Sequence, residues 1–485
     1  MRKWTPVFLS FLAMALYLLT GSRSIQWQDS GQFTLRIGTG ELYNDWGLAM
    51  VHPLHFWLGR LAVTLFPGNM PWAVTGVSAL GGALSVGLVT LCVQRLTRNL
   101  AAALYAGGCL MLAHTFWRFS GMPEVYTLSA ALLLLQAYGL IRLREAEGDP
   151  RWWLLILAAN GLNWANHNLA LLELAILGPL FLAALLRKTL TPARAAAAAG
   201  LWLLTSLPYT GLILQQMIVR GEVLPVVHSA LFGYDFADQV KSLTPTPLFT
   251  AVTLAFLLLS FPLLPLILAA KSIPRLLRPH APVLALLGIH LLFVLRYDVI
   301  DQYTFLIPAM GLLALLAGVG FAADSSRRLP RLAVALLVTQ PLLYALAPPA
   351  ARATGVLRPF ERNKPYRDDA DYLLLPWTFR ETSAAQLATT AVSAAAPDGL
   401  LIVEDSMARY AVEWKRWILG LEAIDLVSPA ETGAIAAATD AGRRVVFAPA
   451  RSQPPPENSV WLAEGEIWRL SPPPAPQPLP PEPAP

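Results

Sequence analysis

The chain of 485 residues is hydrophobic at 55% of its positions and charged at only 14%. In soluble domains roughly a quarter of the residues are charged. This composition therefore excludes an ordinary soluble protein and indicates one surrounded by lipid. The net charge of +5 does not point to nucleic acid. The basic residues recur in short clusters between apolar runs, which is how membrane proteins fix their orientation.

Eleven apolar runs predict membrane spans, which need about 20 apolar residues each. The first has the basic start of a signal peptide but lacks a small-residue cleavage site, so we expect it to remain as a span. The stretch 152–186 could form two short spans broken at residues 163–168 or one long tilted span. The runs lie near residues 5–20, 72–94, 99–117, 125–141, 152–166, 168–186, 196–217, 247–270, 281–295, 303–321 and 332–347.

The basic clusters support this count and give an orientation. If the eleven runs cross in turn, every cluster falls on one side, which the positive-inside rule makes cytoplasmic. We therefore expect residues 21–71, 118–124, 218–246, 296–302 and everything after about 348 to face the other side. The clusters begin at Arg2, Arg95, Arg142, Arg187, Lys271 and Arg327.

The last part of the chain changes character near residue 350, where proline and charge rise and the long apolar runs stop. Residues 399–403 and 444–447 read as buried strands and residues 406–419 as a helix, a pattern typical of a small α/β domain. We therefore divide the chain into a transmembrane domain over 1–348, an extracytoplasmic α/β domain over 349–470, and a disordered proline-rich tail over 471–485.

Polar residues gather in the predicted external loops, where ionisable groups near lipid are functional candidates because they are costly to keep there. Carboxylates and histidines could perform acid–base chemistry, and the donor fork of an arginine matches phosphate oxygens. The sequence contains no nucleotide-binding glycine motif and no clear metal constellation, so we expect no cofactor and no metal. The candidates are Asp29, His52, His114, Arg118, Glu124, Asn166 and His167.

Each candidate also allows a structural interpretation. Asp29 could cap a surface helix. Glu124 could be a residue of a first helical turn, where the helix dipole favours a negative charge. The histidines could be interfacial residues, and Asn166 with His167 could satisfy a broken backbone. Several tryptophans are expected to anchor the chain at the membrane interface, namely Trp27, Trp57, Trp72, Trp152 and Trp153.

Four motifs in order resemble a known family. They are residues 29–33 (DSGQF), His52-Pro53 followed by 66–69 (FPGN), residues 115–117 (TFW) followed by 124–128 (EVYTL), and Asn166-His167. Together they resemble the domain-of-unknown-function 2723 family, which includes the transmembrane protein 260 type of protein O-mannosyltransferase. Arg118 departs from the family, which more usually has a glutamine there.

The resemblance implies a membrane glycosyltransferase of the GT-C type, mainly α-helical, that takes a sugar such as mannose from a polyprenyl phosphate. Asp29 and Glu124 match the family's acidic positions and are expected to be catalytic. His52, His114, Arg118, Tyr126, Asn166 and His167 are expected to bind the donor. The acceptor would be a protein or a glycan, and the active site would face the lumen or the periplasm. The Ala/Leu/Pro-rich composition and the lack of a disulfide framework favour the periplasmic side of a bacterial inner membrane.

Two other classes of function remain open from the sequence. A transporter or lipid flippase also needs polar groups in a bundle, but such proteins often carry paired repeats and polar sites at the bilayer midplane. An envelope scaffold without enzymatic activity would use the α/β domain to bind a partner. Transfer of sugar from a polyprenyl carrier separates the enzyme from both.

Overall fold

The computed structural model describes residues 2–145, 149, 151–326, 328–451, 455 and 461–470. Its contacts divide the chain into two compact units. Residues 1–23, 36–355 and 373–380 form a helical unit, and residues 24–35, 356–372 and 381–485 form an α/β unit. Arg327 and the predicted proline-rich tail lie outside the described residues.

Every predicted span coincides with helix in the helical unit. α8 ends at Asn166 and α9 begins at Ala170, so the stretch 152–186 consists of two helices with a break between them. The helices are α1 (Thr5–Thr20), α4 (Met70–Thr97), α5 (Leu100–Met111), α6 (His114–Ser120), α7 (Tyr126–Glu145), α8 (Arg151–Asn166), α9 (Ala170–Leu186), α10 (Pro192–Arg220), α13 (Pro247–Ser260), α14 (Leu264–Leu276), α15 (Ala281–Arg296), α16 (Ile307–Ala323) and α17 (Arg328–Thr354).

Not all of these helices are long and apolar enough to cross a membrane unaided. Among the described residues five helices pass that test, α4, α7, α10, α17 and the stretch Gln302–Ala323, or seven if two bent pairs each count as one span. The pair α5–α6 bends by 65° and the pair α13–α14 by 92°. Pro262 follows α13 and cannot continue its hydrogen bonds, which explains the second bend. α1, α9 and α15 are shorter apolar helices.

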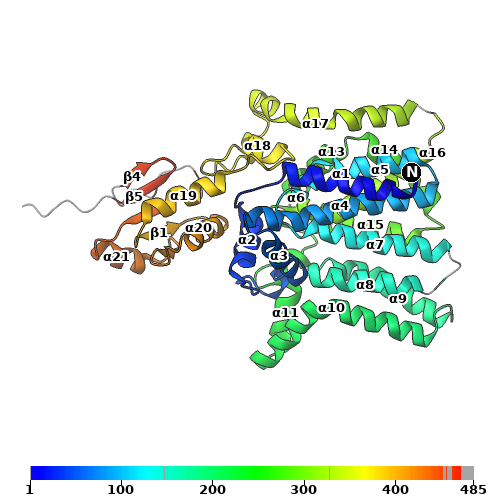
Figure 1. Ribbon diagram of the computed structural model, residues 1–485, viewed down its shortest axis with the longest axis horizontal. Helices are drawn as coiled ribbons and strands as arrows, with labels where there is room; N and C mark the ends of the chain where they lie inside the picture. Colours follow the sequence, from blue (N-terminus) through cyan, green and yellow to red (C-terminus); the bar gives the residue numbers. More distant parts are fainter. Residues whose placement is uncertain are drawn as a thin grey trace, which may run out of the picture. The chain divides into compact units, whose positions relative to one another are not determined.

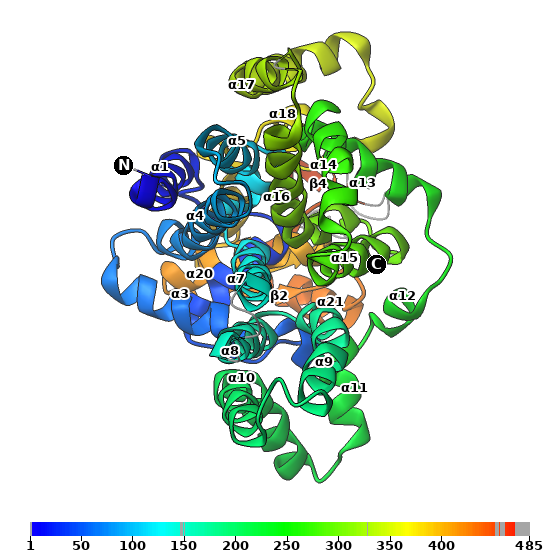
Figure 2. The same cartoon turned by 90° about the vertical axis from the view of Figure 1, so that its right-hand side faces the viewer.

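The helices differ in how far they are buried within the unit. α4, α7 and α16 lie at its centre (Figure 2) and bury most of their side chains. α10 and α17 lie at its periphery and expose most of theirs. Because those exposed side chains are mainly alanine, leucine, valine and isoleucine, the outer helices present the apolar surface that lipid requires.

The basic clusters gather at one end of the helical unit. Arg95 at the end of α4 pairs with Glu145 at the end of α7, with 2.6 Å between Nε and Oε2. Lys271 near the end of α14 pairs with Asp324 after α16, with 2.9 Å between Nζ and Oδ2. The N-terminus lies at this end too (Figure 1). The arrangement agrees with helices that cross in turn.

Short helices connect the spans at the opposite end. They are η2 (Leu48–Met50), α3 (Pro53–Leu65), α11 (Leu224–Phe232), α12 (Ala237–Lys241) and η3 (Gln302–Leu306), while η1 (Arg2–Trp4) precedes α1. α2 (Gln28–Thr39) belongs to the α/β unit up to Leu35 and to the helical unit from Arg36.

The α/β unit holds a five-stranded sheet in the order β2-β1-β3-β5-β4. β1 pairs in parallel with β2 and β3, and β5 pairs antiparallel with β3 and β4. The predicted strand–helix–strand unit is confirmed as β1 (Leu400–Val403), α20 (Ser406–Ile418) and β3 (Val445–Ala448). The sequence had not indicated η4 (Arg358–Phe360), α18 (Asp369–Leu374), α19 (Ser383–Ala395), β2 (Asp425–Val427), α21 (Thr432–Asp440), β4 (Trp461–Glu464) and β5 (Ile467–Leu470).

Candidate active site

Four of the predicted donor-binding residues form one group in the helical unit, called the histidine cluster below, in which His167 is half-buried and the other three are buried. The rings of His52 and His167 stack with their centroids 5.1 Å apart. The ring of Tyr126 lies 5.3 Å from that of His167. Asn166 completes the cluster, because its backbone oxygen lies 2.8 Å from His52 Nδ1. The cluster therefore joins the loop before α3, the start of α7 and the break between α8 and α9.

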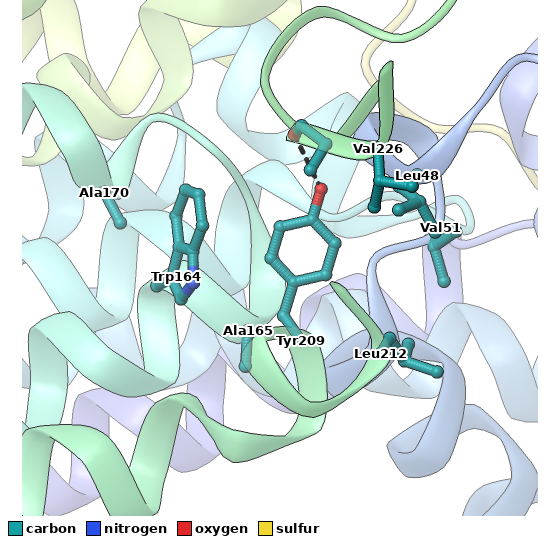
Figure 3. Close-up of a cluster of buried hydrophobic side chains, with 9 residues drawn as sticks. Leu48, Val51, Trp164, Ala165, Ala170, Tyr209, Leu212 and Val226 are labelled. Atoms are coloured by element: carbon teal, nitrogen blue, oxygen red, sulfur yellow. Dashed lines mark hydrogen bonds between the residues drawn. The ribbon is translucent and has the colours of Figure 1, made fainter. Parts of the chain in front are cut away.

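An apolar cluster fixes the loop that leads into His52 (Figure 3). Leu48 and Val51 pack against side chains of α8, α9, α10 and α11. Tyr209 of α10 lies among them and donates its hydroxyl proton to the Ala230 carbonyl at 2.7 Å. Two to three buried apolar side chains contribute several kcal/mol, at about 1.5–3 kcal/mol each. The packing holds His52 beside the α8–α9 break.

Arg36 supports the same loop and was missed by the sequence reasoning. Only 6% of this arginine is exposed, and its guanidinium donates to the carbonyls of Leu42, Tyr43, Met50 and Val51. The hydrogen bonds from this one guanidinium thus hold residues 42–43 and residues 50–51 close together. The available signal was an arginine inside a loop that the family motifs bracket on both sides.

His52 is a neutral ring in this environment. Burial lowers its pKa from 6.5 to about 4, which outweighs the opposing effect of the Asn166 carbonyl. A carbonyl only accepts hydrogen bonds, so Nδ1 carries the proton and Nε2 is the acceptor nitrogen. A neutral His52 cannot supply positive charge to a phosphate at pH 7, although it can accept a proton.

The other two predicted donor-binding residues lie on α6. His114 contacts the rings of Phe256 and Tyr344, with centroids 5.8 and 5.3 Å away. Arg118, one helical turn later, donates from Nη1 to the Leu375 carbonyl at 3.1 Å. These two residues form a second group, on α6.

Aromatic side chains of η3 connect the two groups. Tyr303 stacks on Phe256, the neighbour of His114, with centroids 4.2 Å apart. Phe305 lies 5.2 Å from Tyr126 and 6.0 Å from His167. The two groups therefore share one aromatic wall, which suits the apolar stem of a lipid or the face of a sugar ring.

Glu124 lies in the buried turn between α6 and α7, with 6% of its surface exposed. Its backbone NH and carbonyl both bond to the Ser78 hydroxyl at 2.8 Å. The next residue, Val125, accepts a hydrogen bond of 3.0 Å from the Asn166 side chain. Glu124 is thus adjacent in the chain to a residue that contacts the histidine cluster.

Asp29 belongs to the α/β unit, where it is the second residue of α2. Residues 24–35, called the Asp29 segment below, are held there by side chains on both sides of the aspartate. Trp27 Nε1 donates to the Ser383 hydroxyl at 2.7 Å, and Gln32 Nε2 to the Tyr410 hydroxyl at 2.7 Å. Gln28 has a left-handed backbone with φ of 58°, a strained conformation of the kind found at functional sites.

The expectation that Trp27 anchors the chain at the membrane interface was wrong. Only 1% of its surface is exposed. Its ring lies beneath the ammonium of Lys364, 5.1 Å from the centroid, and Lys364 pairs with Asp405. Trp27 is a core residue of the α/β unit that fixes the chain two positions before Asp29.

Sequence reasoning also missed two ionisable residues inside the predicted spans. Glu173 of α9 and His290 of α15 are both fully buried, with 3.6 Å between Oε1 and Nε2. A charged residue within an apolar run was the available signal. Among the described residues, no three His, Cys, Asp or Glu side chains gather in a way that could hold a metal ion.

The fold is similar to that of solved structures of other proteins. The crystal structure of ArnT from Cupriavidus metallidurans bound to undecaprenyl phosphate matches with a TM-score of 0.62 at 15% identity, covering 96% of this chain and 97% of that one. The Archaeoglobus fulgidus oligosaccharyltransferase (TM-score 0.47, 13% identity) covers 92% of this chain and 69% of its own. The fold assignment rests on the ArnT likeness, and it confirms the predicted GT-C-like helical bundle with a small α/β domain.

The family is then indicated by the sequence match. Residues 49–190 match the family model described as the protein O-mannosyl-transferase TMEM260 N-terminal domain, which confirms the resemblance inferred from the motifs. No curated protein matches the chain significantly. Asp29 lies before the matched segment, which includes His52, His114, Arg118, Glu124, Tyr126, Asn166 and His167.

Proposed function

We propose that this protein transfers a sugar from a polyprenyl phosphate to an acceptor hydroxyl on the extracytoplasmic side of a membrane. One observation carries the proposal. The segment that matches the O-mannosyl-transferase domain supplies all four residues of the histidine cluster, and these residues converge from three separate parts of that segment. The full-length likeness to ArnT bound to undecaprenyl phosphate supports a donor of that class. Mannose is the first sugar to test.

Asp29 is the proposed general base. It removes the proton from the acceptor hydroxyl, the hydroxyl oxygen bonds to the anomeric carbon, and the bond from that carbon to the phosphate oxygen breaks. The polyprenyl phosphate leaves with its negative charge and needs electrostatic stabilisation more than protonation. Glu124 is proposed as a supporting carboxylate that orients the acceptor.

Arg118 is the proposed holder of the donor phosphate. Its guanidinium carries a fork of donors that matches phosphate oxygens, whereas His52 is neutral at pH 7. Arg118 therefore provides the phosphate contact, and the histidine cluster with the η3 aromatics provides packing and hydrogen-bonding groups for the sugar and the first isoprene units. His114, one turn from Arg118, belongs to the same donor site in this proposal.

The orientation follows from the charge pattern. The end of the helical unit that holds the basic clusters is proposed to face the cytoplasm. The opposite end then faces the periplasm of a bacterial inner membrane, where protein or glycan acceptors are available. Membrane lipids surround the outer helices, and nucleic acid has no part in the reaction.

A reconstituted assay tests the proposal. Purified protein in liposomes receives undecaprenyl phosphate loaded with radiolabelled mannose, together with envelope proteins and glycans as acceptors. Asp29→Asn is compared with Asp45→Asn, which changes an exposed aspartate of a neighbouring loop. We expect label transfer by wild type and Asp45→Asn and almost none by Asp29→Asn. Movement of the loaded lipid across the bilayer without transfer would instead identify a flippase.

A further inference from the structure

The helical unit contains a buried polar network that the proposed reaction does not use. Glu173 of α9 accepts hydrogen bonds from Gln136 of α7 at 2.6 Å, from Asn160 at 3.1 Å and from Asn163 at 2.7 Å, the last two on α8. None of the four side chains has more than 1% of its surface exposed. We call this group the Glu173 clasp.

Such a group is costly at membrane depth. A buried carboxylate loses its hydration, and the loss is offset only when donors and a counter-charge surround it. Here three amide groups donate to the two carboxyl oxygens, and the ring of His290 lies beside them, with Nε2 3.6 Å from Oε1. An apolar replacement of a buried ion pair is often as stable as the pair itself. The clasp therefore calls for a role other than stability.

The clasp closes the break between α8 and α9 from both sides. Asn160 and Asn163 precede the break, and Glu173 follows it, so the carboxylate joins the two helices across residues 167–169. Asn160 also donates to the Ala170 carbonyl at 3.0 Å, at the first residue of α9. His167, inside the break, donates its backbone NH to the Asn163 carbonyl at 2.6 Å. The conformation of the break is thus tied directly to the clasp.

A stripe of asparagines extends the clasp to the histidine cluster. Asn160, Asn163 and Asn166 are spaced three residues apart and share one face of α8 over about 9 Å of helix. The side chain of Asn166 donates to the Val125 carbonyl at 3.0 Å and to the Ser129 hydroxyl at 2.8 Å. Its backbone carbonyl accepts a hydrogen bond from His52 Nδ1. The deep carboxylate and the proposed donor site are therefore linked through α8, since Asn163 bonds Glu173 with its side chain and accepts from the His167 NH with its backbone carbonyl.

We propose that Glu173 is a positioning residue for the donor site, since its clasp sets the α8–α9 break so that His167 stacks on His52. The part of this inference that concerns the donor rests on the proposed function. The positioning of the break by the clasp does not, and it can be tested without a donor. A displacement of about 1 Å at a reacting group can cost about 10²-fold in rate. If His52, Tyr126 and His167 hold the sugar donor, the conformation of the α8–α9 break must therefore be fixed.

A crosslinking experiment tests the positioning without any substrate. His52→Cys and His167→Cys are introduced together in a background with Cys92→Ala and Cys109→Ala, and the rate of bridging by a short bis-methanethiosulfonate linker is measured in the purified full-length protein. We expect Glu173→Ala to slow bridging about tenfold, the loss that follows from buried hydrogen bonds worth about 1.4 kcal/mol. Glu173→Gln should bridge at nearly the parent rate. The new glutamine keeps one acceptor oxygen, and a neighbouring asparagine or glutamine can turn its side-chain amide so that its oxygen accepts from the new NH₂ group.

The control separates positioning from loss of stability. Leu315→Ala removes a fully buried side chain of α16, which lies outside the clasp, and should lower the melting temperature without changing the bridging rate. Equal rates in Glu173→Ala and its parent, or equal slowing by Leu315→Ala, would overturn the inference. If Glu173→Ala does not fold, Asn163→Ala removes one donor of the clasp, and an unchanged rate in that variant counts against the inference in the same way.

A binding measurement then connects the clasp to function. Undecaprenyl phosphate is titrated into wild type, Glu173→Ala and Glu173→Gln, all with native histidines. Weaker binding in Glu173→Ala and recovery in Glu173→Gln support the inference. No binding by wild type contradicts the proposed donor, and the crosslinking rates still decide whether the clasp positions the break.

Discussion

The histidine cluster and the Asp29 segment are held in different ways, although both contribute residues to the proposed reaction. The histidine cluster lies in the helical unit and is fixed by a buried apolar cluster, by Arg36 and by the asparagine stripe of α8. The Asp29 segment is fixed by side chains of the α/β unit, above all Ser383 and Tyr410. Donor binding should therefore depend on the helical bundle, whereas the chemical step should also depend on the α/β unit.

The largest expected effect comes from removing the base. Asp29→Asn keeps the shape of the side chain and removes its ability to take a proton, which typically costs about 10² to 10⁴ in rate. Turnover is measured with purified proteins at equal folded concentration. Donor affinity should stay unchanged in this variant. Loss of activity in Glu124→Gln alone, with Asp29→Asn active, would reverse the two proposed roles.

The next effect concerns the donor phosphate. Arg118→Lys keeps the charge but not the fork of donors, and Arg118→Ala removes both. A charge-assisted hydrogen bond is worth about 1.5–3 kcal/mol, so Arg118→Ala should weaken undecaprenyl phosphate binding by roughly 10- to 100-fold, with Arg118→Lys in between. Equal affinity in all three proteins, measured by titration, would remove Arg118 from the site.

Acid should destabilise the helical unit through His52. Its pKa is about 4 in the folded chain against 6.5 for the free side chain, so between these values the unfolded state binds more protons and the free energy of unfolding falls as the pH falls. At pH 5 the loss is about 2 kcal/mol for this group. Melting curves at pH 7.5 and 5 should show a smaller drop for His52→Gln than for wild type, and equal drops would contradict the assignment.

The smallest effect should come from loosening the Asp29 segment. Trp27→Phe keeps most of the buried ring and removes the hydrogen bond to Ser383, worth about 1 kcal/mol. We expect kcat to fall about fivefold with no change in donor affinity, since the histidine cluster belongs to the other unit. Ser383→Ala should behave alike. A weaker donor affinity in either variant would show that the two regions are not independent.

Much of the fold was predictable because lipid imposes a strong pattern on sequence. Each apolar run is helical, and the break expected within residues 163–168 lies at residues 167–169, between α8 and α9. The bend between α13 and α14 was missed, although Pro262 marks it. The antiparallel pair β4 and β5 was also missed, because strands of four residues beside proline-rich sequence carry little periodicity.

The residues of the candidate site could be predicted from the motifs that contain them, but the contacts between these residues could not. His52, Tyr126 and His167 were chosen from separate motifs, and only the structure brings their rings together. Glu173 was overlooked because it belongs to no motif, although its place inside an apolar run was a signal. The partners that hold Trp27 and Gln32 lie more than 350 residues further along the chain, a separation that no local pattern reports.

The most direct test of the account is the release of undecaprenyl phosphate from mannose-loaded carrier by the reconstituted protein, measured with acceptor present. We predict that wild type releases the carrier phosphate in step with label transfer to the acceptor, and that Asp29→Asn binds the loaded carrier equally well but releases almost none. Release at the wild-type rate by Asp29→Asn would contradict the proposed role of this aspartate, and the absence of release by wild type would contradict the proposed reaction.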